Sequence, residues 1–150
     1  MQILQTAFDS ELGQKAAALR VEVFVQEQHV PPEEELDHYD ASATHFVALE
    51  NDRVIATFRI VRLDSPEGPI AKIGRVAVAK IHRNRGIGRQ IMLVALAHAR
   101  AAGYKKCTLG AQIQVVAFYE KLGFIPHGPI FDDAGIPHRQ MSLDLTEPAA

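Results

Sequence analysis

The chain has 150 residues, a length at which proteins form one hydrophobic core, so we expect a single domain over residues 1–150. Apolar residues make up 47% of the chain and charged residues 23%, which excludes the highly charged composition of disordered proteins. The formal net charge of -2 excludes a general attraction for phosphate backbones, so no nucleic acid partner is expected.

The N-terminal residues show no basic region followed by a long apolar stretch, so we predict no signal peptide. No run of the sequence approaches the roughly 20 apolar residues that a membrane span requires, and we expect no membrane partner. Cys107 is the single cysteine, which excludes an internal disulfide and gives no sign of an oxidising compartment. We therefore expect a cytoplasmic protein.

The first part of the chain predicts a strand, a helix and an acidic loop. Residues 3–8 favour a strand, and Asp9 or Ser10 then provides a helix cap. Apolar residues recur at helical spacing through residue 25, after which two prolines end the pattern. Residues 33–40 contain five carboxylates, and for this acidic run we predict a loop that creates a local negative field.

The middle of the chain predicts three strands and a long helix. Residues 45–49 and 54–61 are rich in β-branched and aromatic residues, with an Asn-Asp pair between them, and predict a hairpin. Residues 71–79 predict a third strand, which ends just before a basic segment that contains glycine. A helix is expected to begin near Gly88, with its apolar positions on one face, and to end at Gly103.

The last part of the chain completes the pattern of strands and helices. Residues 106–111 predict a strand, residues 115–122 a short helix, and residues 139–145 a strand with alternating apolar side chains. The order is therefore strand, helix, three strands, helix, strand, helix and two strands. This order predicts an α/β fold with mixed strand pairing, in which helices cover the faces of one sheet.

The strongest chemical signal is the segment Arg83-Asn84-Arg85-Gly86-Ile87-Gly88, between the third predicted strand and the long helix. Its two glycines allow a tight turn that brings backbone amides close to a bound anion, and the helix N-terminus adds partial positive charge. With Arg89, three arginines surround the turn and suit a ligand with several phosphate charges, such as a pyrophosphate. A P-loop is excluded because no Gly-Lys-Ser/Thr follows. The alternative interpretation is a strand-to-helix turn with solvated arginines.

Two separated motifs resemble the GNAT N-acetyltransferase family. One is Arg75-Val76-Ala77-Val78 followed by Arg83-x-x-Gly86-x-Gly88, and the other is Ala117-Phe118-Tyr119-Glu120-Lys121-Leu122-Gly123-Phe124. Three further segments, around Glu27, Gln112 and His138, are similar to the bacterial ElaA/YjcF-like branch. The resemblance implies a mixed, mostly antiparallel twisted sheet flanked by helices. It also implies transfer of an acetyl group from acetyl-coenzyme A to a primary amine of a small molecule or peptide by direct attack, and a homodimer as the assembly.

The resemblance assigns residues to acetyl-coenzyme A binding. The strand residues Val76, Ala77 and Val78 are expected along the pantetheine arm, and Tyr119 beside the thioester sulfur. The pyrophosphate is expected at the turn, which consists of Arg83, Asn84, Arg85, Gly86, Ile87, Gly88 and Arg89. Gln112 stands where many members carry an asparagine that contacts the pantetheine, so this contact is expected to differ in reach.

For catalysis we predict Tyr119 as the acid that protonates the leaving thiolate, with a packed aromatic residue as the alternative interpretation. Candidates for the base are Glu27, Glu35, Asp37 and His138, and of these we predict Glu35 and Asp37 in the acidic run. The alternative is that the run is a solvated face. No metal is predicted, because no two histidines lie at i, i+4 on one helix and no second cysteine accompanies Cys107, which we expect to be packed in the core.

Two other functions remain as alternatives. Leu19-Arg20-x-Glu22-Val23-Phe24, Glu35-x-Asp37-x-Tyr39-Asp40 and Arg59 resemble the N-terminal pattern of acyl-homoserine lactone synthases. Those synthases usually carry a tryptophan and lack the glycine turn, whereas this chain has the turn and no tryptophan. The second alternative is a non-catalytic module that senses coenzyme A.

Overall fold

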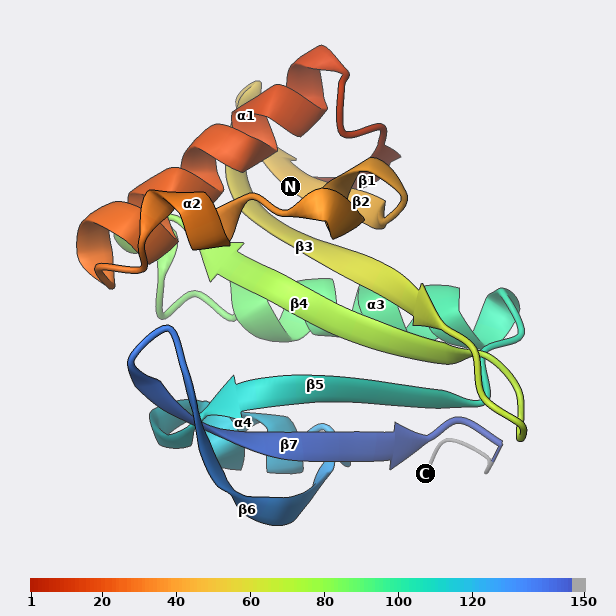
Figure 1. Cartoon of the computed structure of the whole chain (residues 1–150). Helices are drawn as coiled ribbons and strands as arrows, with labels where there is room; N and C mark the ends of the chain where they lie inside the picture. Colours follow the sequence, from red (N-terminus) through yellow and green to blue (C-terminus); the bar gives the residue numbers. More distant parts are fainter. Residues whose placement is uncertain (147–150) are drawn as a thin grey trace.

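Seven strands form one sheet in the order β1-β2-β3-β4-β5-β7-β6 in the computed structural model, which describes residues 1–146 (Figure 1). The strands are β1 (Gln2–Thr6), β2 (Thr44–Glu50), β3 (Arg53–Leu63), β4 (Ile70–Val78), β5 (Lys106–Gln112), β6 (Ile125–Asp133) and β7 (Ile136–Asp144). Neighbouring strands are antiparallel except for β4 and β5, which are parallel. The expected mixed, mostly antiparallel sheet with flanking helices is confirmed.

The helical elements follow the predicted order and add several short segments. They are α1 (Glu11–Arg20), the π-helix η1 (Val21–Glu27), α2 (Pro32–Glu35), η2 (His38–Ala41), η3 (Lys80–His82), α3 (Ile87–Ala101), η4 (Ile113–Val115) and α4 (Val116–Glu120). The Ser10 side chain caps α1 by accepting a 3.0 Å hydrogen bond from the Gly13 amide. Within the described residues, no helix combines the length and the apolar character that crossing a membrane requires.

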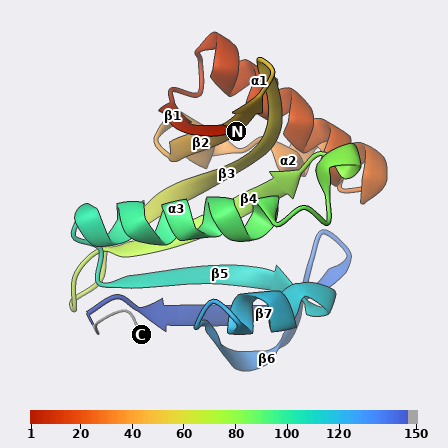
Figure 2. The ribbon, with the colours of Figure 1, turned by 180° about the vertical axis from the view of Figure 1, so that it is seen from behind.

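The helices lie on two faces of the sheet. In Figure 1, α1 and α2 lie in front of the part of the sheet formed by β1 to β4, and α3 and α4 lie behind it. Figure 2 shows the reverse side, where α3 runs along β3 and β4 while α4 lies beside β5 and β7. Residues of α1 contact β2, β3 and β4, and residues of α3 contact β3 and β4. The front of the β5 and β7 side therefore has no helix over it among the described elements.

The hydrophobic core lies mainly between α3 and the back of the sheet. Helix α3 buries six apolar residues at helical spacing, which are Ile87, Ile91, Met92, Ala95, Leu96 and Ala99. Burial of each large side chain stabilises the fold by about 1.5–3 kcal/mol. Cys107 is fully buried in the same core, and this burial raises the pKa of its thiol to about 12. The predicted packing role of Cys107 is confirmed.

Strands β4 and β5 are paired over only part of their length. Their parallel ladder runs from Ile70 opposite Lys106 to Lys72 opposite Thr108, and the strands diverge beyond it (Figure 1). Within residues 1–146, the edge of β4 that faces β5 therefore has no strand partner beyond Lys72. Unpaired strand edges carry free backbone N–H and C=O groups, so this edge can bind an extended ligand.

A bulge distorts β4 at the same place. Gly74 pairs with Arg59 and Ala77 pairs with Thr57 on β3, so two residues of β4 lie opposite the single residue Phe58. The first of the two, Arg75, has φ 53°, a left-handed conformation that is unfavourable for a side chain other than glycine. Strained residues of this kind are common at functional sites.

Candidate active site

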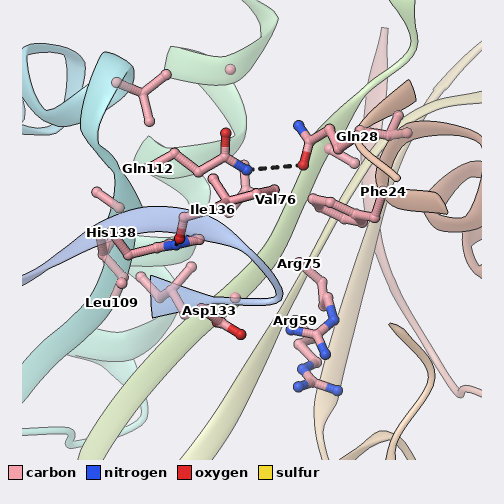
Figure 3. A pocket seen from close by; sticks show the side chains of 18 of the residues that line it. Phe24, Gln28, Arg59, Arg75, Val76, Leu109, Gln112, Asp133, Ile136 and His138 are labelled. Atoms are coloured by element: carbon pink, nitrogen blue, oxygen red, sulfur yellow. Dashed lines mark hydrogen bonds between the residues drawn. The ribbon is translucent and has the colours of Figure 1, made fainter. Parts of the chain in front are cut away.

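A cleft of about 890 Å³ opens where β4 and β5 diverge. One side is formed by η1, the acidic run and β4, and the other side by β5, α4 and the β6–β7 hairpin. Figure 3 shows Phe24, Arg59 and Arg75 on one side of this space and Gln112 and His138 on the other. Eleven of the twelve predicted coenzyme A residues line this one cleft, and the twelfth, Arg85, does not.

The glycine turn opens into the cleft at the N-terminus of α3. Gly86 is the N-cap of the helix and has φ 76°, so its left-handed conformation favours glycine although space around it is open. The preceding Asn84 is also left-handed, with φ 63°. The cap supplies no side-chain hydrogen bond to α3. The first amides of the helix are therefore free to bind an anion.

Two of the three arginines at the turn have acidic partners. Arg83 contacts Glu27 on η1 at 2.8 Å and donates a hydrogen bond of 2.9 Å to the Val78 carbonyl. Arg85 contacts Glu50 on β2 at 3.0 Å. Exposed ion pairs contribute little stability, but these contacts hold both side chains close to the turn. The alternative of wholly solvated arginines does not describe Arg83 and Arg85.

Tyr119 is both a packed aromatic residue and a residue of the cleft, so it fits both interpretations made from the sequence, packing and proton donation. Its ring is 8% exposed and packs edge-on against Phe118 and Phe124, with centroid distances of 5.0 and 5.9 Å. The residue also lines the cleft. Burial raises the pKa of the Tyr119 hydroxyl to about 12, so the phenol keeps its proton at neutral pH. A protonated phenol on the wall of the cleft can act as a proton donor.

A hydrogen bond links the two sides of the cleft. The Gln112 Nε2 atom at the end of β5 donates to the Gln28 Oε1 atom next to η1, at a distance of 2.9 Å (Figure 3). The resemblance predicts a pantetheine contact for Gln112, and the sequence predicts no role for Gln28. The two residues are 84 positions apart, so no local pattern could have joined them.

The acidic run is only partly a solvated loop: Glu33 and Glu34 are exposed, whereas its later carboxylates belong to a compact cluster with arginines. Glu35 and Asp40 are only 1% and 2% exposed, and Arg20 is 2% exposed. Arg20 contacts Glu35 at 3.0 Å and Asp40 at 2.7 Å. Such buried pairs require mutual charge compensation, and removal of one partner leaves a buried charge. The prediction of a loop with a negative field is corrected on this point: Glu35 and Asp40 are neutralised by arginine.

Asp37 belongs to the same cluster at the edge of the cleft. Arg59 contacts its two carboxylate oxygens at 2.7 and 2.9 Å, and Arg75 contacts it at 3.2 Å. Three arginines thus face three carboxylates, because Arg59 also reaches Asp40 and Arg75 also reaches Glu35. The hydrogen bond from Arg59 lowers the pKa of Asp37 and outweighs the opposite effect of partial burial.

The same balance determines the ionisation of Asp40. Burial alone would raise its pKa, but hydrogen bonds from Arg20 and the Asp37 amide outweigh burial and hold the pKa at about 2. Both aspartates therefore stay ionised at neutral pH and accept a proton poorly. Among the described residues, arginine binds one oxygen of Glu35, and its other oxygen is buried without a hydrogen-bond partner. These contacts favour a charge-pairing role for Glu35 and Asp37 over the predicted role as base.

The family model described as an acetyltransferase (GNAT) domain matches residues 9–145. The chain belongs to the GNAT acetyltransferase family. Its GNAT relatives include the uncharacterized N-acetyltransferase YjcF of Bacillus subtilis, 37% identical over 139 residues that cover 92% of this chain and 96% of YjcF. Protein ElaA of Escherichia coli is 33% identical over 131 residues, covering 86% of this chain and 85% of ElaA. The predicted ElaA/YjcF-like branch is therefore confirmed.

Solved structures agree with this GNAT assignment. The crystal structure of Escherichia coli ElaA superposes with a TM-score of 0.83 at 28% identity and covers 95% of this chain and 99% of ElaA. An acyl-CoA N-acyltransferase from Pseudomonas aeruginosa has a TM-score of 0.82 at 29% identity, covering 94% of this chain and 97% of that protein. The protein is thus a GNAT acyltransferase, and the cleft between β4 and β5 is its candidate active site.

Proposed function

We propose that this GNAT enzyme moves an acetyl group from acetyl-coenzyme A to a primary amine of a small molecule or peptide. One observation carries the proposal: the free N-terminus of α3, the unpaired edge of β4 and Tyr119 all border the same cleft. An anion site, an edge for an extended chain and a proton donor are the three features that this reaction requires.

The proposed cosubstrate fits the cleft along β4. The free amides at Gly86, Ile87, Gly88 and Arg89 would hold the pyrophosphate, with Arg83, Asn84 and Arg85 around them. The unpaired edge of Val76, Ala77 and Val78 would hold the pantetheine arm, with Gln112 on the facing strand. Arg83 already occupies the Val78 carbonyl, so the remaining backbone groups of this edge are available for the arm.

The proposed reaction is direct attack. The nitrogen lone pair of a neutral amine forms a bond to the thioester carbonyl carbon, and the carbon–sulfur bond then breaks. Tyr119 donates its proton to the leaving thiolate, and a base removes the extra proton from the nitrogen. The Tyr119 hydroxyl is protonated at neutral pH, as donation requires, and burial, which raises its pKa to about 12, makes it a weaker acid than a free phenol.

The test is a panel of amines with acetyl-coenzyme A, in which free thiol and the acetylated amine are both measured. Formation of the two products in equal amounts supports the proposal. Binding of acetyl-coenzyme A without acetylation of any amine would favour the sensor alternative. A homodimer and a cytoplasmic location stay predictions, which light scattering and cell fractionation test.

Acyl chains of increasing length test the synthase alternative in the same assay. The residues that suggested it, Arg20, Glu35, Asp37, Asp40 and Arg59, form the charge-balanced cluster described above. Mutual pairing of buried charges is required whatever the substrate is, so the presence of this cluster does not favour a synthase. We expect acetyl to be preferred over longer chains.

A further inference from the structure

The carboxylate candidates for the base are all bound by arginine. Asp37 is bound by Arg59 and Arg75, and Glu27 is bound by Arg83 at 2.8 Å. Glu35 lies within the cluster with one oxygen bound and the other buried. An arginine that donates to a carboxylate oxygen occupies a lone pair that a base would use to accept a proton. The remaining candidate is His138.

The His138 ring at the start of β7 has a defined arrangement of its hydrogens. Its Nδ1 atom lies 2.7 Å from the Ile136 carbonyl oxygen, and a carbonyl oxygen can only accept. The hydrogen must therefore be on Nδ1, and in the neutral ring Nε2 carries the lone pair. Among the described residues, this bond is the one hydrogen bond that the ring makes, so Nε2 stays free.

Packing fixes the plane of the ring. Phe131 of β6 stacks on His138 with a centroid distance of 5.6 Å and an interplanar angle of 29°. Gly110 of β5 leaves room for this stack, because a Cβ atom there would lie 3.2 Å from the Phe131 ring and 3.9 Å from the His138 ring. A ring held by a hydrogen bond on one edge and a stack on one face has little freedom to turn.

The ring lines the same cleft as Tyr119 and Gln112. His138 is the cross-strand neighbour of Gln112, which ends the strand facing the unpaired edge of β4. Figure 3 shows the His138 side chain pointing from β7 into the cleft, on the same side as Gln112 and opposite Phe24, Arg59 and Arg75. His138 therefore lines the wall of the cleft that lies opposite β4.

We propose that the Nε2 atom of His138 is the general base of the acetyl transfer. The inference rests on the proposed function. As the amine nitrogen bonds to the carbonyl carbon, Nε2 takes one N–H proton and the ring becomes imidazolium, while Nδ1 keeps its hydrogen and goes on donating it to the Ile136 carbonyl oxygen. The carbon–sulfur bond breaks with its electron pair on sulfur, and Tyr119 supplies the proton of the thiol. Solvent then returns the proton from His138 to Tyr119.

Kinetics of two variants test the proposal. His138→Ala and His138→Gln both remove the basic nitrogen, and we expect kcat to fall about 10²-fold or more because general bases contribute typically 10²–10⁴ in rate. Added imidazole is expected to restore part of the rate of His138→Ala. Affinity for acetyl-coenzyme A is expected to stay within about twofold of the parent, since no coenzyme contact of the ring is proposed.

His127 provides the matched control. It lies on β6, is exposed, and bonds to Ser142 at 2.8 Å outside the cleft. We expect His127→Gln to keep the parental kcat. Parental kcat in both His138 variants overturns the proposal, and so does a lower rate that comes with lost acetyl-coenzyme A binding and is not restored by imidazole. A parent that binds acetyl-coenzyme A but acetylates no amine contradicts the proposed function itself.

A second measurement needs no substrate. Long-range ¹H–¹⁵N correlation spectra of the labelled protein show which ring nitrogen carries the hydrogen, and His138→Gln identifies the signals of His138. At a pH about 2 units above the usual imidazole pKa of about 6.5, we expect hydrogen on Nδ1 and none on Nε2. A neutral ring with hydrogen on Nε2 overturns the proposal, because that nitrogen could not accept a proton.

Discussion

Gln112 donates a hydrogen bond of 2.9 Å to Gln28 across the cleft, so the amide that is expected to contact the pantetheine already has a partner. Binding of the cosubstrate at Gln112 would then compete with Gln28. The two residues should therefore have opposite effects on affinity, although they form one contact.

We expect Gln112→Ala to weaken acetyl-coenzyme A binding, because a hydrogen bond contributes about 0.5–1.5 kcal/mol, or roughly 2- to 13-fold in Kd. Gln28→Ala is expected to leave Kd unchanged or to lower it, because it releases the Gln112 amide. Isothermal titration calorimetry of the parent and both variants measures the difference. Equal weakening in both variants would show that the bridge itself supports binding.

Gly86 and Gly103 provide a matched pair of glycines. Both are left-handed, with φ 76° and 85°, and neither has a neighbour that a Cβ atom would meet within 4 Å. They lie at opposite ends of α3, and of the two only Gly86 lines the cleft. Valine is strained at either position, so both substitutions are expected to lower Tm.

Only Gly86→Val is expected to abolish the rise in Tm that acetyl-coenzyme A produces. A ligand at 100 times its Kd stabilises the folded state by about 2.7 kcal/mol, and a variant without the anion site loses this gain. Thermal unfolding with and without ligand is the measurement. If acetyl-coenzyme A raises the Tm of Gly86→Val as much as that of the parent, the glycine turn does not form the anion site.

Tyr119→Phe keeps the buried ring and removes only the hydroxyl. We expect kcat to fall about 10²- to 10⁴-fold, the usual contribution of a general acid, with Tm and acetyl-coenzyme A affinity close to those of the parent. Rapid-quench measurement of the chemical step is the assay, so that product release does not hide the effect. An undiminished chemical step would make Tyr119 a packing residue only.

The Tyr119 hydroxyl also affects stability at high pH. Its folded pKa of about 12 is above the usual value of 10.0, so the unfolded chain loses this proton first as the pH rises. The contribution of Tyr119 to stability is therefore fully present below pH 10 and is lost between pH 10 and about 12. Denaturant unfolding in this range should show a smaller loss in Tyr119→Phe than in the parent.

Asp40 has the opposite effect at low pH. Its folded pKa is about 2 and its usual value is 3.8, so the unfolded chain binds the proton first as the pH falls. The stabilisation is present above pH 3.8 and is lost toward pH 2, and the difference corresponds to about 2 kcal/mol. Urea unfolding of the parent and Asp40→Asn should show a shallower acid dependence in the variant. If the parent and Asp40→Asn lose stability equally as the pH falls, Asp40 does not cause the acid dependence.

Much of the fold could be predicted because it depends on local patterns. The 3.6-residue spacing of apolar side chains predicted α3, and its expected start near Gly88 is one residue from the observed start at Ile87. The charge cluster could not be predicted, since Arg20 reaches Asp40 across 20 positions and Arg75 reaches Asp37 across 38. The acidic sequence by itself is compatible with either an exposed loop or a buried cluster. The arginines on α1, β3 and β4, which are distant in the sequence, decide between them.

The acidic run contains exposed carboxylates and carboxylates bound by arginine. We expect substitutions of the two kinds to change the kinetics of the acceptor amine in different ways. Glu33 and Glu34 are exposed, whereas Asp37 is bound by Arg59 and Arg75 at the edge of the cleft. If the acceptor is a cationic amine, Glu33→Gln and Glu34→Gln are expected to raise its KM modestly. The difference should shrink as salt is added, because ions screen exposed charges beyond about 10 Å at 0.1 M.

Asp37→Asn is expected to behave differently, because it removes the charge that compensates two arginines. Arg59 and Arg75 would then add positive charge to the cleft, and a cationic amine would bind less well even at high salt. If Asp37 were the base, kcat would fall about 10²- to 10⁴-fold at saturating amine, whereas with His138 as the base the change lies mainly in KM and in Tm. Measuring kcat and KM at two ionic strengths for all three variants distinguishes these outcomes. A salt-independent collapse of kcat in Asp37→Asn, with Tm unchanged, would return the role of base to Asp37, because lost charge pairing alone does not abolish turnover in a protein that remains folded.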